Sequence, residues 1–232
     1  MKKILEFIDI KQQEFAQVPL MKFLEDKTID PSQRLAFAPC VAPFAMNFGD
    51  LNKYILREEP AKNEIQKIVN QHTYEDENHW MWFLEDLVTL NLDPSQKFSD
   101  SLRFMWGEET KKTRACCNTL IAICISQVEP IQKLVIVEAI EATGNVILSR
   151  TAQVAKELQQ ITQKQYHYFG EHHFAVETGH TRGEFNIEPF LETLELNQQQ
   201  TQESLELVKA VFKAFTEATE EMLEFALSRQ IK

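Results

Sequence analysis

The sequence predicts an all-α protein, organised as a single bundle of seven to eight helices over residues 1–232. Apolar residues recur at helical spacing along nearly the whole chain. The chain is rich in residues that favour helices, mainly Glu, Gln, Leu, Ala and Lys. It has only 6 glycines and 8 prolines, too few for the many turns of a β-sandwich. Its 232 residues suffice for one large domain with a full core, and no repeat or low-complexity linker divides them.

Apolar spacing and capping residues predict the helices of the first ninety residues. Ile4, Ile8 and Phe15 share one face of a first amphipathic helix, and a shorter helix precedes Asp30. Asp30-Pro31 marks the start of the next helix, because aspartate caps helix ends and proline suits the first helical position. Two more prolines follow within that helix, so we expect a kink or a break there. The expected ranges are residues 31–57, with Pro39 and Pro43 inside, and residues 61–90, after Glu59-Pro60.

The rest of the chain also reads as helices joined by short connections. Glu129-Pro130 is a helix start of the same kind as Asp30-Pro31. The apolar positions of the last helix form a narrow stripe, which suits either a core or the seam of a dimer. The expected helices are residues 99–126, residues 130–150, one that contains residues 173–180 and is separate or continuous with a bend, a short one from Pro189, and one from about Gln198 to the C-terminus.

Charge and composition exclude several classes of protein. The net charge is −11, and basic residues cluster only at Lys111, Lys112 and Arg114, so nucleic acid is not an expected partner. No segment approaches the ~20 apolar residues of a membrane span, and the first residues do not resemble a secretory signal. Four cysteines do not make a disulfide framework, which fits a reducing cytoplasm. We therefore expect a cytoplasmic protein that binds neither nucleic acid nor membrane.

One pattern occurs twice and contains four of the six histidines. On an α-helix the offsets 0, 4 and 7 fall on one face, because each residue turns about 100°. Each copy therefore directs two imidazoles and one carboxylate the same way. Two such helices facing each other offer the nitrogen and oxygen ligands that iron, manganese and zinc prefer. The copies are His72-x3-Asp76-x2-His79 and His173-x3-Glu177-x2-His180.

The spacing within a copy favours two metal ions over one. The end histidines lie ~10.5 Å apart along a helix axis, at ~1.5 Å per residue. That separation is too large for one ion but suits two ions ~3.5–4 Å apart with the carboxylate between them. A bridging carboxylate is available in the apolar stretch of residues 135–142. Glu141 is the preferred bridge and Glu138 is the alternative or a second ligand, because a carboxylate buried there without a cation would be unfavourable.

Each of these features also has a simpler interpretation. A single His-x3-Glu pair on a helix is usually a surface pair, and the acidic run at residues 75–77 fits a solvated face. His167 and His172 lie off the main face, so we expect surface or supporting roles for them. The aromatic clusters at residues 80–84 and 104–106 are typical of core packing, and they could also line a dry substrate pocket.

The motifs resemble those of the heme-oxygenase-like diiron oxidases, in particular the CADD-like and pyrroloquinoline-quinone-synthase-like proteins. The resemblance rests on Asn78-His79-Trp80-Met81-Trp82 in an early helix, an acidic residue in a middle helix and the late H-x3-E-x2-H motif, and it covers about residues 30–225. It implies a heme-free bundle of seven or eight helices. It also implies two iron ions, in some members manganese, that activate O2 for the oxidation of a small organic substrate. The implied metal ligands are His79, Glu141, His173, Glu177 and His180.

The sequence departs from this family at the first copy of the pattern. Several members have a glutamate seven residues before the first-helix histidine, where this chain has His72. Either His72 is itself a ligand, or Asp76 or Glu75 supplies the carboxylate, and we favour Asp76 because it mirrors the acidic residue of the second copy. No histidine precedes His72, so the axial ligand of heme oxygenase is missing and no heme is expected. The cysteines at 116, 117 and 124 have no evident base nearby, which argues against the thiol nucleophile of the thiaminase-type branch.

The leading hypothesis is a non-heme dinuclear iron or manganese oxidase or oxygenase, with O2 and a small organic molecule as its substrates. One alternative is a cofactor-free oxidase of the pyrroloquinoline-quinone-synthase type, whose histidines act as acid–base groups near neutral pH. The other is a non-catalytic helical binding protein, for which the stripe on the last helix would form the seam of a homodimer.

Overall fold

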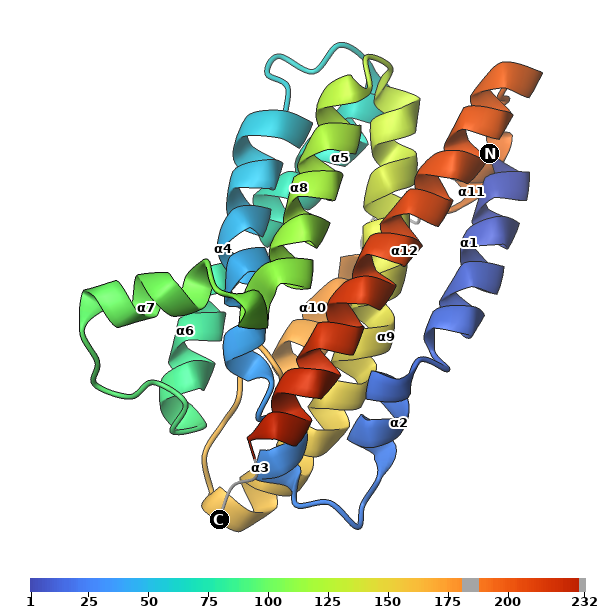
Figure 1. Cartoon of the computed structure of the whole chain (residues 1–232). Helices are drawn as coiled ribbons and strands as arrows, with labels where there is room; N and C mark the ends of the chain where they lie inside the picture. Colours follow the sequence, from blue (N-terminus) through green and yellow to red (C-terminus); the bar gives the residue numbers. More distant parts are fainter. Residues whose placement is uncertain (181–187, 230–232) are drawn as a thin grey trace.

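The computed structural model describes residues 1–180 and 188–229, with the side chains of residues 177–180, 188, 189 and 192 excepted. Throughout this described part the regular structure is helical and contains no strand, which confirms the predicted all-α bundle. Figure 1 shows the long helices running side by side, while one short helix, α7, projects from the bundle.

Residues 1–56 form short helices separated by prolines and caps. Asp30 begins the third helix as predicted, because its carboxylate accepts a hydrogen bond from the Ser32 amide at 2.8 Å. The helix expected over residues 31–57 is broken, and a 3₁₀ turn that contains Pro39 separates its pieces. The elements are α1 (Lys2–Phe15), α2 (Pro19–Glu25), α3 (Pro31–Arg34), η1 (Ala38–Val41), α4 (Ala42–Leu51) and η2 (Asn52–Leu56).

The prediction of a single long helix over residues 61–90 is wrong, and the difference divides the first histidine pattern. The segment forms two helices, α5 (Glu64–Asp76) and α6 (His79–Thr89). Asn78, with φ −115° and ψ 2°, interrupts the helical backbone between them. The first two residues of the pattern therefore lie on α5, whereas His79 opens α6, and the pattern does not occupy one face of one helix.

Two further differences concern helix ends. The helix expected over residues 99–126 is split at Gly107, and the Arg114 guanidinium donates to two backbone carbonyls at this split, at 2.9 and 2.8 Å. Helix α9 continues past its predicted end at Arg150 to Thr162, because neither proline nor glycine occurs between them. The elements are α7 (Phe98–Met105), η3 (Glu108–Thr110), α8 (Lys111–Ser126), α9 (Pro130–Thr162), α10 (Glu171–His180), α11 (Glu188–Thr193) and α12 (Gln198–Ser228).

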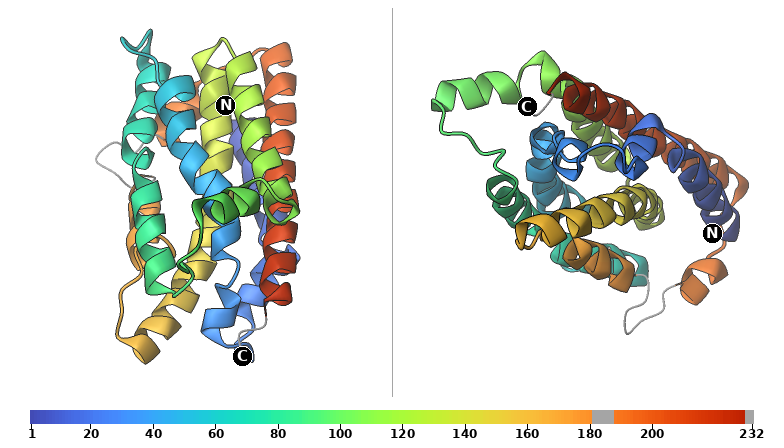
Figure 2. Two further views of the ribbon diagram at one scale, coloured as in Figure 1. Left: turned by 60° about the vertical axis from the view of Figure 1, so that its left-hand side comes forward. Right: turned by 90° about the horizontal axis from the view of Figure 1, so that it is seen from below.

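Helix α9 is the element around which most of the others pack. It contacts α1, α2, α3, α5, α10 and α12. The right-hand view of Figure 2, which looks along the bundle, shows α9 near its centre. One cluster of buried apolar side chains extends from Met1 to Ala226, so the described helices share one core.

The apolar stripe of α12 belongs to this core. Val208, Phe212, Phe215 and Met222 are between 0 and 5% exposed. The Phe212 ring meets the Phe15 ring of α1 edge-on at 6.0 Å between centroids. The chain itself covers the stripe, which is therefore not available as the seam of a homodimer.

Helix α7 differs from the other helices because none of its residues is buried. Phe98 at its start is 77% exposed, and Trp106 just after its end is 69% exposed. The right-hand view of Figure 2 shows α7 standing away from the bundle axis. Its contribution to the core is Phe104, a partly buried ring whose centroid lies 5.8 Å from that of Phe225 on α12.

No helix within the described residues is long and apolar enough to cross a membrane. The four cysteines are free and buried.

Candidate functional site

Four of the predicted ligand residues line one internal cavity of about 90 Å³. These residues are Asp76, His79, Glu141 and His173, and Thr113 also lines the cavity. The other lining residues are mostly apolar or aromatic: Phe37, Val41, Phe44, Ala45, Phe48, Trp80, Cys116, Ile140, Gly144, Ile147, Leu148, Tyr168, Phe169, Phe215, Ala218 and Met222. The cavity thus combines a few ionisable groups with an apolar wall, which is the usual character of a small-molecule site.

The ionisable groups of this site are buried and lie in imidazole–carboxylate pairs. Asp76, His79 and His173 are 3 to 5% exposed, and His72 and Glu141 are 7 and 8% exposed. His72 Nδ1 lies 3.6 Å from Glu141 Oε1, and His79 Nδ1 lies 3.8 Å from Asp76 Oδ1. Buried carboxylates are unfavourable without compensating partners. In each of these pairs the imidazole, when protonated, can supply a positive charge beside the carboxylate.

The rings of His79 and His173 bring the two copies of the pattern together. Their centroids are 4.5 Å apart with an interplanar angle of 74°. Trp82 stacks on His79 at 4.5 Å and meets His173 edge-on at 5.7 Å. Helices α6 and α10, a hundred residues apart in the sequence, each place a histidine at this point.

A backbone hydrogen bond holds His173 in one orientation. Its Nδ1 lies 2.9 Å from the carbonyl oxygen of Tyr168, which can only accept a hydrogen bond. Nδ1 therefore carries the proton in the neutral ring, and Nε2 has the lone pair. A ligating histidine usually has an outer hydrogen bond of this kind, because it fixes the tautomer and the direction of the ring.

Asp86 holds the turn that supplies this carbonyl. It lies on α6 with 1% exposure, and its carboxylate accepts hydrogen bonds from the amides of His167 (2.8 Å) and Phe169 (2.9 Å). Burial raises the pKa of Asp86, and the hydrogen bonds from the turn oppose this effect. Asp86 is not among the site residues predicted from the sequence. The signal that could have found it is its position seven residues after His79, which puts both on one face of α6.

Arg57 and Gly49 fix the junction between α5 and α6. The Arg57 guanidinium donates to the Thr73 carbonyl at 2.9 Å and to the Glu77 carboxylate at 2.6 Å, which lowers the pKa of Glu77. Gly49 of α4 packs against the same junction so closely that a Cβ there would lie 2.9 Å from the Glu77 carbonyl oxygen. These contacts determine where α6 begins and thus where His79 lies. No motif in the sequence marks either residue.

The remaining predicted ligands do not line the cavity or lie outside the described residues. Glu75 is half-buried, and its carboxylate accepts a hydrogen bond from Gln71 Nε2 at 3.2 Å. Glu138 is half-buried one turn before the preferred bridge and is not one of the described residues around the cavity. The side chains of Glu177 and His180, at the end of α10, lie outside the described part, so their role stays a prediction.

His167 and His172 lie nearer the surface, as expected from their position off the main face. His172 is exposed, and its ring meets Trp82 edge-on at 4.7 Å. His167 Nδ1 lies 3.0 Å from Glu85 Oε2, with the two side chains 43 and 60% exposed.

The donor atoms of the site suit a transition metal. Three imidazoles and two carboxylates are the nitrogen and oxygen ligands that iron and manganese bind. Among the described side chains, however, no three His, Cys, Asp or Glu residues are spaced to hold one ion. Two of their contacts each join one imidazole to one carboxylate, His72 to Glu141 and His79 to Asp76. The two further ligands predicted on α10 are not part of that set.

Comparison with known proteins adds no family assignment. No protein-family model matches the chain, and no curated protein shows significant similarity to it. The chemistry of the cavity is therefore the basis for a functional proposal.

Proposed function

We propose that this protein is a non-heme oxidase or oxygenase that holds two iron ions, or manganese ions, and uses O2 to oxidise a small organic substrate. The observation that supports this most is the burial of two histidines and two carboxylates on the wall of an apolar cavity, with His72 buried beside Glu141. Ionisable groups gathered in a buried cavity mark functional sites more often than structural ones, because their burial opposes folding. The resemblance of residues 78–82 and of the late H-x3-E-x2-H motif to those of the heme-oxygenase-like diiron oxidases favours the same chemistry.

The residues that would hold the ions come from four helices of the bundle. Bound there, the two ions supply O2 binding and the electrons for its reduction. Histidines bind metals in the neutral form, and the Tyr168 carbonyl keeps the proton of His173 on Nδ1. The proposed ligands are His72, Asp76, His79, Glu141 and His173, together with Glu177 and His180 from the sequence pattern.

The cavity wall supports a small and largely apolar substrate. Phe44, Phe48, Ile147 and Phe215 contribute apolar surface from α4, α9 and α12. Such a wall binds apolar groups and keeps bulk water away from the buried carboxylates.

Metal analysis after anaerobic loading with Fe(II) tests the proposal, with two adjacent histidines as a matched pair. The wild-type protein is expected to retain about two iron ions per chain. His173→Ala removes the buried ring that contacts His79 and should lower the iron content, whereas His172→Ala removes an exposed ring on the same helix and should leave it unchanged. Quenching of Trp82 fluorescence, in a variant with Trp80→Phe and Trp106→Phe, gives an independent readout because Trp82 stacks on His79.

Two results would contradict the metal proposal. One is an iron content below about half an ion per chain that His173→Ala does not change. The other is an equal loss of iron in the His172→Ala and His173→Ala variants, which would indicate surface binding.

The pairing of imidazoles with carboxylates also favours a second candidate, a cofactor-free oxidase. In that case the His79–Asp76 pair at 3.8 Å would act as an acid–base couple toward a bound organic substrate. O2 consumption that persists after removal of all metal with a chelator would support this candidate. Activity that is lost with the chelator and restored by Fe(II) would exclude it.

A further inference from the structure

A buried carboxylate outside the proposed ligand set controls the backbone before α10. Asp86 receives hydrogen bonds from the amides of His167 and Phe169, one to each carboxylate oxygen, and its charge also acts on the Tyr168 amide. Three consecutive amides directed at one carboxylate fix the turn at residues 167–169. An aspartate that is 1% exposed and has backbone partners on a different element is unlike the surface carboxylates of the chain.

The turn at residues 167–169 in turn fixes His173. The Tyr168 carbonyl accepts the hydrogen bond from His173 Nδ1 at 2.9 Å, and the His167 carbonyl accepts the one from the His173 amide at 3.2 Å. Both the ring and the backbone of His173 are thus held by the segment that Asp86 holds. Between the Asp86 carboxylate and the His173 ring, the hydrogen bonds pass only through backbone groups of residues 167–169.

Asp86 also lies on the same helix as the other histidine of the contact. It follows His79 by about two turns of α6, and the buried Phe83 between them packs edge-on against Tyr168 at 5.3 Å. Helix α6 therefore carries both His79 and the group that orients the turn behind His173. A shift of α6 would move both partners of the His79–His173 contact together.

We propose that Asp86 is a positioning residue, which sets the ring orientation and the proton position of His173 through the turn at residues 167–169. The inference rests on the proposed function for its purpose, which is to present Nε2 of His173 to the cavity. The predicted tautomer of His173 can nevertheless be measured in the metal-free protein, independently of that function.

Nitrogen-15 NMR of the metal-free protein, labelled in its histidines, tests the proposal. His173 is assigned from the signal that disappears in His173→Gln. In the wild type its Nδ1 is expected to be protonated and its Nε2 unprotonated. Asp86→Ala should convert this signal into that of a ring that exchanges between tautomers. Asp86→Asn, whose amide oxygen can still accept one of the hydrogen bonds, should show a smaller change.

Glu221→Gln is the matched control. Glu221 of α12 is also a buried carboxylate, 5% exposed, that accepts backbone hydrogen bonds from another helix, at Lys112 (2.6 Å) and Thr113 (2.9 Å). Its substitution should lower stability without changing the His173 signal, so a loss of stability alone cannot imitate the expected result.

The proposal is overturned if His173 in the wild type is protonated on Nε2. It is equally overturned if Asp86→Ala folds and keeps the wild-type His173 signal, or if Glu221→Gln changes that signal as much as Asp86→Asn does. Where Asp86→Ala fails to fold, the comparison of Asp86→Asn with Glu221→Gln decides the matter.

Cobalt(II) binding, followed by its visible absorption, connects this role to the metal. We expect the affinity to fall about tenfold in Asp86→Asn and to change less in Glu221→Gln, because outer hydrogen-bond partners of ligands contribute on this scale. A wild-type protein that binds no cobalt would contradict the proposed function. The NMR measurement of the His173 tautomer would still test the role of Asp86.

Discussion

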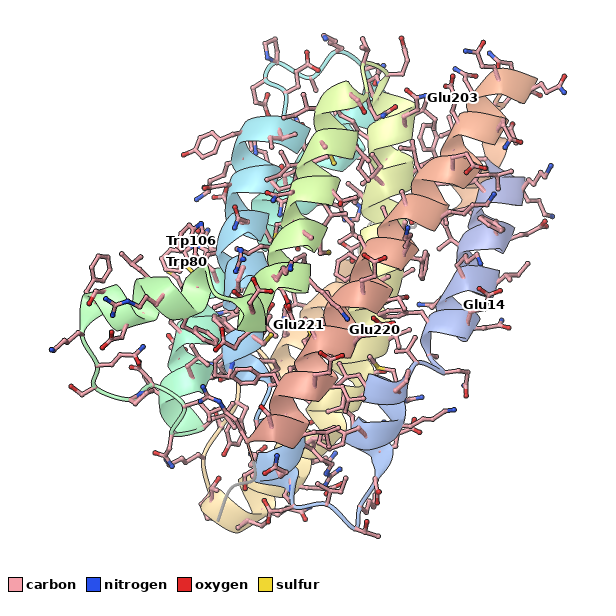
Figure 3. The ribbon with its side chains drawn as sticks, in the orientation of Figure 1. Glu14, Trp80, Trp106, Glu203, Glu220 and Glu221 are labelled. Carbon is pink, nitrogen blue, oxygen red and sulfur yellow. The ribbon has the colours of Figure 1, made fainter. Side chains whose placement is uncertain are left out.

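Single carboxylates connect distant parts of this protein by accepting hydrogen bonds from backbone amides. Glu221 on α12 does so at the first turn of α8, where it also accepts a hydrogen bond from the Thr113 hydroxyl at 2.8 Å. Figure 3 shows Glu221 where α12 passes the start of α8, with Glu220 beside it on α12. The free amides at the start of a helix need such a partner, and here a side chain from another helix provides it.

The neighbouring residues Glu220 and Glu221 are expected to differ strongly in their contribution to stability. Glu221→Ala should lower the free energy of unfolding by about 3 kcal/mol, because it leaves buried amides of α8 without their charged acceptor. Glu220→Ala should lower it by less than ~0.5 kcal/mol, because that carboxylate forms a surface pair with Lys112 at 3.0 Å. Urea unfolding of both variants measures the two values. Equal losses would show that Glu221 does not act as a cap.

The four cysteines are expected to be unreactive in the folded protein. Burial raises the pKa of Cys40, Cys117 and Cys124 to about 12 and also raises that of Cys116. Since the thiolate is the reactive form, a disulfide reagent at about pH 8 should modify these thiols only when the chain unfolds. The rate should match the unfolding rate in the same buffer. Rapid modification of one native cysteine would contradict the buried placement.

At the scale of helices, the sequence predicted where helices start better than where they break. The starts at Asp30 and Glu129-Pro130 depend on the residues at the start itself, so local reasoning found them. The break between α5 and α6 depends on Arg57 and on the close approach of Gly49, which are distant in the sequence from Asn78. The convergence of the site could be predicted from the doubled pattern, whereas the role of Asp86 required the turn it binds.

Two glycines offer a matched test of the junction between α5 and α6. Gly49→Ala should lower stability by about 1–3 kcal/mol, because the new Cβ would lie 2.9 Å from the Glu77 carbonyl and the junction must shift. Gly144→Ala should raise stability by about 0.5–1 kcal/mol, because a Cβ added there would meet no atom within 4 Å beyond its own stretch of helix and alanine favours a helix interior. Thermal unfolding of both variants checks the signs. A Gly49→Ala variant as stable as the wild type would show that the junction can move.

The cap of α3 should give a pH-dependent contribution to stability. Hydrogen bonds from Ser32 lower the pKa of Asp30 from its ordinary value of 3.8 in the folded protein. The stabilisation is therefore complete above that ordinary value and is lost as the pH falls through the lowered folded pKa. Asp30→Ala should cost about 1 kcal/mol at neutral pH, and the difference from the wild type should shrink in acid. Urea unfolding at both pH values measures it, and a constant difference would argue against the carboxylate as the cap.

At the scale of the whole molecule, the site is assembled from α5, α6, α9 and α10, so no contiguous stretch of the chain contains it. Periodicity predicted the bundle, and the two copies of the pattern predicted the meeting of His79 and His173, whereas the places of Glu177 and His180 stay a prediction. The order in which helices pack depends on the summed fit of many apolar side chains, which spacing along one sequence does not encode. The projecting position of α7 could not be predicted from spacing either, because its apolar spacing alone would place it against the core.

The central position of α9 has a consequence for hydrogen exchange. Leu134, Val135, Ile136 and Ala139 are all 0% exposed, and Glu141 lies on the same stretch of helix. Amides there should exchange with solvent only through global unfolding, with the free energy that urea unfolding gives, whereas amides of α7 should exchange through local opening. Mass spectrometry of deuterated peptides measures both. If exchange around Glu141 is slowest, the carboxylate at the centre of the proposed site stays in place while the periphery of the bundle opens and closes.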